Sequence, residues 1–306
     1  MFKNLFLYRV GPEWPQTAGQ FAEALATEPF AECGATQQKS TGWVPPREEH
    51  GALVESVAGH WIARMLIETK SVPASAVKDR AAEAALNIER LTGRKPGKKE
   101  MRDLKDDALF ALLPQAFPRQ KAVTVWIDPE TRIMALDATS QSAADDAITS
   151  LVRVAGKGFA VGMLQTKVSP KAAMADWLLD EEGDALPEAF SVGRECELKG
   201  IGDEPERVRF DHHDLEAARG HVRAGKLPTR LALSWMGRVS FQLTQALQIK
   251  KIAFHEGVFE GGPQNKDDDR FDADVALSTG ELKPQIADLI AVLGGEEPPN
   301  ESEELK

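Results

Sequence analysis

The residues with the clearest potential for catalysis lie near the end of the chain, where Asp272, Asp274 and Glu281 precede Lys283. Metal-dependent nucleases gather carboxylates around Mg²⁺ beside a lysine in a similar order. That chemistry needs Glu281 and Lys283 on a strand, because residues i and i+2 of a strand face the same way. The sequence instead predicts a helix from Thr279, which would turn the two side chains about 200° apart and place Glu281 at the positive end of the helix dipole. A structural role is favoured, and a metal-dependent nuclease is kept as an alternative.

Other patterns that could bind a nucleotide or a metal lack the context that this chemistry needs. The glycine-rich stretch from Gly156 to Gly162 follows a predicted helix, whereas a phosphate-binding loop leads from a strand into a helix. The six histidines, including the adjacent His212 and His213, do not have the spacing of metal ligands. Cys33 and Cys196 are far apart in sequence and fit a reducing cytoplasm. We expect no catalytic residue, no metal and no cofactor.

The composition is that of an ordinary soluble globular protein, with 42% apolar and 28% charged residues and no apolar run near the roughly 20 residues that span a bilayer. A net charge of −11 argues against a nucleic-acid partner, because phosphate binding depends on Lys and Arg. The charge is nevertheless segregated: residues 78–105 carry +4 and 207–251 carry +6, whereas 172–206 carry −9 and 252–306 carry −10. An acidic exterior with one basic surface would give this distribution and still bind DNA. Blocks that are scattered in space and cancel would give it as well.

Short alternating runs and separate helical stripes predict an α+β fold of mixed antiparallel sheets with helices. The predicted strands are 2–8, 53–57, 60–68, 121–128, 133–137, 159–164, 190–198, 207–210, 230–235, 239–243 and 249–255, and the predicted helices are 17–26, 73–91, 100–113, 140–154, 170–179 and 215–224. Near the end of the chain, an alternating run from Phe271 to Leu277 precedes a last helix, which Thr279 can cap and which stops at Gly294.

The helices 73–91 and 100–113 are joined by a turn rich in Gly and Pro, which predicts a protruding αα-hairpin. A two-helix arm has no core of its own, so its apolar side chains are expected to meet the body or another chain. The predicted organisation is a central α+β domain (1–72 with 118–170), a helical tip subdomain (73–117), a base α+β domain (171–295) and a disordered acidic tail (296–306).

Several word-like segments resemble one known family. They are MFKNLFLYR at 1–9, GWVPP at 42–46, LLPQAF at 112–117, VWID at 125–128 and RFDADVALSTGELKPQIADLIAVLGGE at 270–296. Their wording, order and spacing resemble the recombination-associated protein RdgC of bacteria. The resemblance implies horseshoe-like monomers that form a ring-shaped homodimer around a basic hole. It further implies non-enzymatic binding of double-stranded DNA with little sequence preference, competition with the strand-exchange recombinase, and a cytoplasmic, nucleoid-associated protein without a membrane partner.

The resemblance also suggests which residues carry these roles. Phe117 matches an aromatic of the family and is expected, with Leu112 and Leu113, to contact the partner subunit; the alternative is that Phe117 lies in the core of its own chain. The expected DNA contacts are basic or protonatable residues in three groups: Arg94, Lys95, Lys98 and Lys99; Arg119 and Lys121; and Arg207, Arg209, His212 and His213, with Arg219, Arg223 and Lys226 as weaker candidates.

This chain departs from the family pattern at two places. Gln115 stands where relatives tend to carry a basic residue, and Asp211-His212-His213-Asp214 stands where relatives can show consecutive lysines. Fewer fixed positive charges should weaken DNA binding, and the two histidines should strengthen it as the pH falls towards 6. A pure interaction protein whose acidic surface mimics DNA remains a second alternative function.

Overall fold

A computed structural model describes residues 2–47, 51–156, 158–181, 183–202, 206–211, 215–258 and 267–298. Within these residues the chain has seven α-helices and twelve strands, so the predicted α+β class is confirmed. All strand pairs between named strands are antiparallel. None of the helices that the structure describes is long and apolar enough to cross a lipid bilayer.

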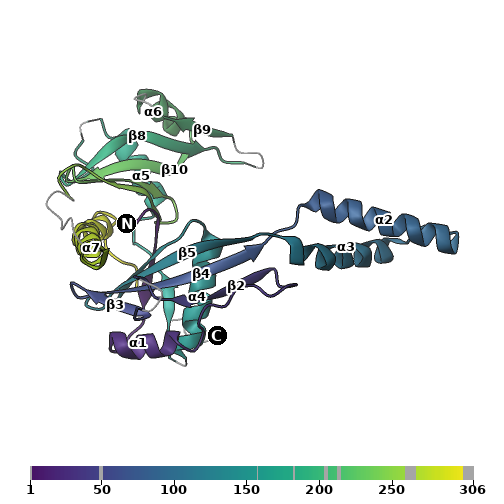
Figure 1. The fold of residues 1–306 in the computed structure, drawn as a ribbon. Helices are drawn as coiled ribbons and strands as arrows, with labels where there is room; N and C mark the ends of the chain where they lie inside the picture. Colours follow the sequence, from purple (N-terminus) through teal and green to yellow (C-terminus); the bar gives the residue numbers. More distant parts are fainter. Residues whose placement is uncertain are drawn as a thin grey trace.

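The strands of the predicted central and base domains belong to one continuous sheet (Figure 1). Ten of them lie in the order β2-β4-β5-β6-β1-β12-β11-β10-β8-β9, while β3 pairs with β4 and β7 with β1. The strands are β1 Leu5–Val10, β2 Lys39–Val44, β3 Val54–Val57, β4 His60–Lys70, β5 Pro118–Asp128, β6 Ile133–Asp137, β7 Val161–Met163, β8 Phe190–Lys199, β9 Arg207–Phe210, β10 Leu227–Trp235, β11 Val239–Thr244 and β12 Ile249–Phe254. The central and base halves are joined where β1 meets β12, at Leu5 opposite Ile249.

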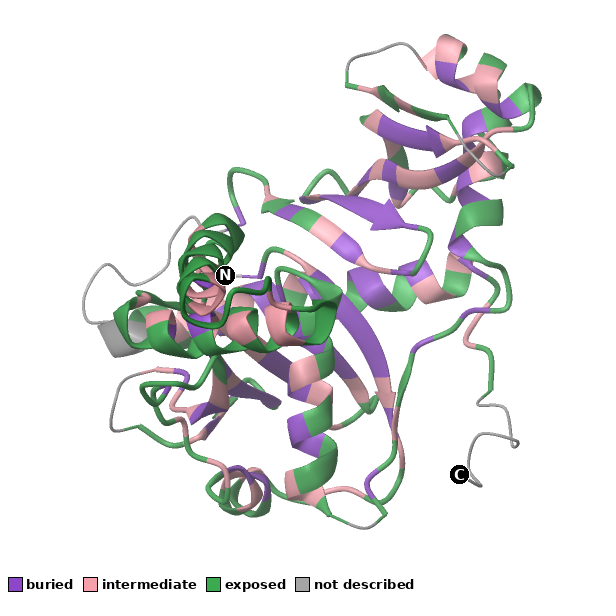
Figure 2. Cartoon of the chain, turned by 90° about the vertical axis from the view of Figure 1, so that its right-hand side faces the viewer, coloured by how far each residue is buried: buried purple, intermediate pink, exposed green. Residues whose placement is uncertain are grey.

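The central half buries apolar residues on both faces of the sheet, because Leu7, Ile62 and Trp126 belong to the core that it shares with the base half. Buried residues run along strands of both halves (Figure 2). On the central half, Phe6, Val125 and Met65 belong to a core that packs under α1 (Ala18–Leu25) and α4 (Gln141–Ala155). On the base half, the other face packs under α5 (Pro170–Leu179), α6 (Leu215–Arg223) and α7 (Asp267–Val292). The face of the base half that continues the α1–α4 side is therefore not covered by these three helices.

Two helices, α2 (Ala74–Thr92) and α3 (Lys98–Leu112), lie side by side and project away from the sheet (Figure 1). Gly93 ends α2 in the left-handed conformation with φ 71°, which glycine adopts without strain. Only Ala81 on α2 and Ala108 on α3 are buried. We call this pair of helices the arm. Its free end is the turn at Gly93, and its root is the short 3₁₀ segment Leu113–Gln115 that leads into β5.

The last helix begins much earlier than the sequence predicted. α7 runs from Asp267 through Pro284 to Val292, so the expected helix start at Thr279 is wrong. The hydroxyl of Thr279 donates instead to the carbonyl oxygen of Val275 at 2.8 Å, inside the helix. Val275 and Leu282 are both fully buried. Burial of the apolar side of α7 therefore outweighs the low helix propensity of the Ser278-Thr279-Gly280 run.

A strand was also missed at β2, a segment for which no element is predicted from the sequence. Trp43 exchanges backbone hydrogen bonds with Glu28 and Phe30 on one side and pairs with β4 on the other. A Cβ atom on Gly42 would lie 2.3 Å from the Cα atom of Phe30. Gly42 is therefore required by the close approach of the neighbouring backbone and does not mark a turn.

The first residue of the predicted acidic tail, Glu296, contacts the folded part of the chain. Glu296 forms a bridge with Thr166, and its carboxylate accepts hydrogen bonds from the guanidinium of Arg9. The rest of the predicted tail, 299–306, lies outside the described residues.

Candidate nucleic-acid interface

The uncovered face of the base half carries a concentration of positive charge. Side chains alternate along each strand, and on β8 to β12 the buried members are apolar, such as Leu198, Leu231 and Ile249. The other members, or residues at the bulges beside them, include six cations. We call this surface the basic face; its cations are Lys199, Arg207, Arg209, Arg230, Lys250 and Lys251, and its carboxylates are Glu195 and Glu197.

Arg207 and Arg209, both predicted DNA contacts, lie on the edge strand β9 and share one carboxylate. Their guanidinium nitrogens are 3.7 Å and 3.3 Å from Glu197, which is almost fully buried. Burial alone would raise the pKa of Glu197, but a hydrogen bond from Thr229 and the positive charge of Arg230 and the two β9 arginines lower it. Glu197 is therefore ionised and orients both arginines while offsetting only one of their charges.

Glu195 holds a second part of the basic face together. Its carboxylate accepts hydrogen bonds from Lys251 Nζ at 2.7 Å and from the amide of Gln242. The hydrogen bond from Lys251 lowers the pKa of Glu195, so this carboxylate is also charged at neutral pH. The six cations thus face two carboxylates, and the surface keeps a net positive charge.

At the free end of the arm, Arg94 is engaged in capping the second helix. Its guanidinium makes two hydrogen bonds to Glu100, at 2.8 Å and 2.7 Å. Glu100 also accepts from the backbone N–H of Gly97 at 2.8 Å. The bonds from Arg94 and Gly97 lower the pKa of Glu100 to about 2. The neighbouring cations of this predicted group, Lys95, Lys98 and Lys99, are exposed.

The predicted dimer contacts lie at the root of the arm, where the 3₁₀ segment enters β5. The Phe117 side chain is 90% exposed, so it is not part of the core of its own chain. Leu112 is half-buried, and Leu113 is fully buried within the chain. Phe117 is therefore the residue of this group that is most accessible to a partner.

Arg119 and Lys121 follow Phe117 on β5, and both side chains are exposed. They are spaced by two residues from the buried Val123 and Val125, so all four side chains face the same side of β5. That is the side which α1 and α4 cover at Val123 and Val125. This side is continuous with the basic face through β6, β1 and β12. Arg119 and Lys121 thus share one side of the sheet with Arg209.

The remaining basic candidates near β9 are engaged elsewhere or are not described. Arg219 donates to the carbonyl oxygens of Leu178 and Asp180 at the end of α5. Arg223 binds Glu181 and Glu216, and Lys226 binds Glu206. His212 and His213 lie outside the described residues.

The nuclease alternative is not supported by the positions of its residues. Asp272 accepts a hydrogen bond from Arg47 at 2.7 Å. Glu281 binds Arg238, and Lys283 binds Asp128 and Glu130. As predicted, Glu281 and Lys283 are on a helix, although in its interior and not at its start. Within the described residues, no three His, Cys, Asp or Glu side chains are grouped so that they could hold a metal ion.

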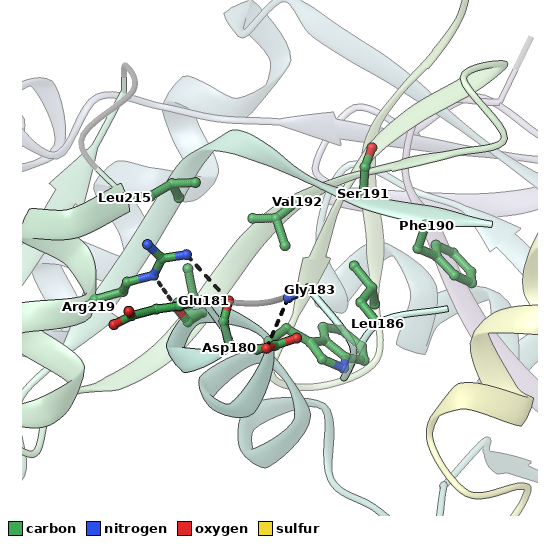
Figure 3. A pocket seen from close by; sticks show the side chains of 11 residues that line it. Asp180, Glu181, Gly183, Leu186, Phe190, Ser191, Val192, Leu215 and Arg219 are labelled. Atoms are coloured by element: carbon green, nitrogen blue, oxygen red, sulfur yellow. Dashed lines mark hydrogen bonds between the residues drawn. The ribbon is translucent and has the colours of Figure 1, made fainter. Parts of the chain in front are cut away.

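A pocket of about 310 Å³ lies between the end of α5, the start of β8 and α6 (Figure 3). Trp177, Phe190 and Leu215 contribute to its apolar lining. The polar groups around it mainly bind one another: Arg219 bonds to the backbone of α5, and Asp180 accepts from the N–H of Gly183 at 3.0 Å. Its described lining includes one serine and neither histidine nor cysteine, so it offers no nucleophile with an adjacent base.

Sequence reasoning missed four cations of the basic face, namely Lys199, Arg230, Lys250 and Lys251. Arg230 is the one charged residue of β10, Lys250 and Lys251 are adjacent in β12, and Lys199 ends β8. Charges of this kind are ordinary in half-buried strands. The available signal was alternation, because Arg230 follows the period that buries Leu231 and Leu233 on the other face. Only the sheet order brings these separate strands together.

Comparisons with known proteins agree on one family. The family model described as "Putative exonuclease, RdgC" matches residues 1–296. The recombination-associated protein RdgC of Dechloromonas aromatica (strain RCB) is 39% identical over 302 residues, covering 96% of this chain and 98% of the relative. The protein of the same name from Herminiimonas arsenicoxydans is 39% identical over 300 residues, covering 97% and 98%. That from Burkholderia cenocepacia is 38% identical over 299 residues, covering 96% of each chain.

Proposed function

The chain belongs to the RdgC family, and from this premise we propose that it binds double-stranded DNA without sequence preference, as a ring-shaped homodimer, and has no enzymatic activity. By occupying DNA it would restrain recombinase-dependent homologous recombination in the cytoplasm, in association with the nucleoid. The observation that carries the proposal is the basic face, a positively charged sheet surface on a protein whose net charge is −11.

The composition of the basic face supports contact with a nucleic-acid backbone. Lys and Arg neutralise phosphates and release counterions, which provides affinity without regard to sequence. The acidic segments 172–206 and 252–306 repel phosphates, which disfavours binding at the parts of the surface that they form. On the basic face six cations accompany two carboxylates, and Arg119 and Lys121 lie on the same side of the sheet, so the charges form a track along it. In the part of the chain that the structure describes, these cations lie on strands and not on a helix that could read bases.

The arm supports the dimer part of the proposal. Exposed apolar side chains occur along it from free end to root: Leu91 is 86% exposed, Phe110 55% and Phe117 90%. Such a series on a two-helix arm is expected to be covered by another surface. In a two-fold dimer each arm would meet its counterpart, and two horseshoe-like subunits would then close a ring.

The absence of catalysis is also part of the proposal, although the family model carries the word exonuclease. Two of the three acidic residues that could bind Mg²⁺ are engaged by a cation from a different element: Asp272 by Arg47, and Glu281 by Arg238. Asp272 and Glu281 are both on α7, separated by roughly 13 Å along the helix axis. To bring them to one metal ion, these ion pairs would have to break and α7 would have to unwind. Incubation with Mg²⁺ is therefore expected to leave duplex DNA intact.

The experiment compares two arginines that are both ion-paired and substantially exposed on the base half. Arg209→Gln removes a charge from the basic face, whereas Arg223→Gln removes one from α6, on the other side of the sheet. The proposal predicts that Arg209→Gln weakens duplex binding and that Arg223→Gln has little effect. Equal affinity of both variants and the unaltered protein would contradict it. If the unaltered protein binds recombinase but no DNA, the acidic-mimic alternative is supported instead.

A further inference from the structure

One lysine of the basic face has a backbone conformation that is unusual for its place in the fold. Among the described residues, five residues other than glycine have a positive φ. Four of them lie in the turns of β-hairpins, where this conformation is ordinary; they are Ala58, Arg132, Met236 and Leu247. The fifth, Lys251, has φ 52° inside β12. The left-handed conformation strains a residue that has a Cβ atom, and at Lys251 no turn explains it.

The unusual conformation of Lys251 belongs to a β-bulge. The register between β11 and β12 shifts at this point, so Lys251 is an extra residue in β12. Ile249 and Ile252, on either side of it, are both buried in the core. In a strand that alternates without interruption, Lys251 would face this core together with Ile249. The bulge instead allows two consecutive lysines, Lys250 and Lys251, to face away from it.

The bulge is held in place at the junction of the two halves of the sheet. The backbone N–H of Lys251 donates to Oδ1 of Asn4 at 3.3 Å. The N–H of Ile252 donates to the carbonyl oxygen of Lys3 at 3.0 Å. The N–H groups of Lys3 and Asn4 in turn donate to the carboxylate of Asp137 on β6. Lys251 is therefore fixed where β12 of the base half adjoins β1 of the central half.

The side chain of Lys251 is accessible to a ligand on the basic face. It is 63% exposed, and its Nζ atom is 2.7 Å from Oε2 of Glu195. An ion pair this exposed contributes little, because water screens its charges. Glu195 also accepts a hydrogen bond from Gln242. Lys251 could therefore exchange Glu195 for a phosphate oxygen without leaving that carboxylate unpartnered.

From these observations we propose that the bulge positions Lys251 to bind a phosphate of the DNA backbone at the junction, so that one duplex crosses from the base half to the central half. In the strand order, β12 lies between β9, which carries Arg207 and Arg209, and β5, which carries Arg119 and Lys121. The strained backbone is then explained as the cost of placing a cation between these two groups. The identity of the ligand rests on the proposed function.

The first arm of the test separates the charge of Lys251 from its backbone conformation. Lys251→Gln removes the charge and keeps the conformation, whereas Lys251→Gly removes the charge and relieves the strain. Both variants are expected to lower the slope of log duplex affinity against log salt by about 0.9, the value for one phosphate contact. Lys251→Gly should also melt at a higher temperature than Lys251→Gln.

Two control variants match these changes one by one. Ala58→Gly relieves the same conformation, with φ 50°, in a hairpin turn, and Lys171→Gln removes a charge from α5, under the opposite face. Both should leave the slope unchanged. If both Lys251 variants bind duplex with the slope and affinity of the unaltered protein, the contact at Lys251 is overturned and the proposed function is retained. If the unaltered protein binds no duplex, both are overturned.

The second arm tests the path of the duplex across the junction. Arg119→Gln removes a cation of the central half and should also lower the slope by about 0.9. Arg119→Gln combined with Lys251→Gln should lower it by about 1.8, because the two residues contact different phosphates of one duplex. A reduced slope in Lys251→Gln with an unchanged slope in Arg119→Gln would place the duplex on the base half alone and overturn the crossing.

Discussion

Replacement of Phe117 by alanine perturbs a side chain that has almost no role in its own subunit. Phe117 is 90% exposed at the root of the arm. Its removal should therefore change the free energy of unfolding of the monomer by no more than about 0.5 kcal/mol, as is usual for surface positions. A partner that buries it would gain about 1.5–3 kcal/mol per side chain from the area removed from water.

In a two-fold dimer the contact occurs twice, so Phe117→Ala should weaken dimerisation by about 3–6 kcal/mol. Each 1.4 kcal/mol is a factor of ten, so the dimer dissociation constant should rise roughly 100- to 10,000-fold. Sedimentation equilibrium over a concentration series measures this constant, and urea denaturation measures the stability of the subunit. Weaker duplex binding should accompany the loss of dimer.

The matched control is Ile201→Ala, which truncates an equally exposed apolar side chain on the base half, at 79% exposure. This variant should leave both the dimer dissociation constant and the free energy of unfolding of the subunit unchanged. If Phe117→Ala dimerises as well as the unaltered protein, or if it destabilises the subunit by more than about 1 kcal/mol, the assignment of Phe117 to the subunit interface is refuted.

Three further predictions concern the scaffold. Glu100→Gln should speed amide hydrogen exchange at the start of α3 without changing global unfolding. Because the pKa of Glu100 is lowered to about 2, its capping contribution is complete above pH 4.5 and should disappear only as the pH falls towards 2. Trp43→Phe removes the indole N–H that donates to Ser150 Oγ at 2.9 Å, and should cost about 1–2 kcal/mol in urea unfolding. Burial lowers the pKa of His60, so folded protein binds this proton less readily than unfolded chain does. Stability should therefore be constant above about pH 6.5 and fall below it, and His60→Gln should reduce that fall, measured by thermal unfolding. An unchanged pH profile in His60→Gln would contradict this explanation.

Local patterns predicted most elements because their cause is local. Two of the predicted helices begin at Thr17 and Ser140, which are the N-cap residues of α1 and α4, and alternation located the strands of the base half. The prediction was wrong at the start of α7. The apolar residues from Phe271 to Leu277 fit the two-residue period of a strand, but a stretch of seven residues is too short to exclude the 3.6-residue period of a helix. Only packing against the sheet, with Val275 fully buried, decides in favour of the helix.

The candidate interface was only partly predictable, for a related reason. Arg207 and Arg209 were found because a family resemblance pointed to them. Arg230 and Lys250 were not, because they are 20 residues apart and come to one side of the sheet only through the strand order β12-β11-β10. Likewise, nothing local indicates that Leu5 pairs with Ile249 and makes one sheet from two halves. The pairing of strands that are distant in sequence determines which charged residues come together on one face.

The most direct test of the central claim is the binding of a fluorescent linear duplex over a series of salt concentrations, with and without Mg²⁺, together with the mass of the protein and of the complex by light scattering. The expected result is a dimer that binds intact duplex of any sequence, with affinity that falls steeply as salt rises, and DNA that remains uncut in Mg²⁺. Failure to bind at low salt, binding as a monomer with equal affinity, or Mg²⁺-dependent cleavage would contradict it.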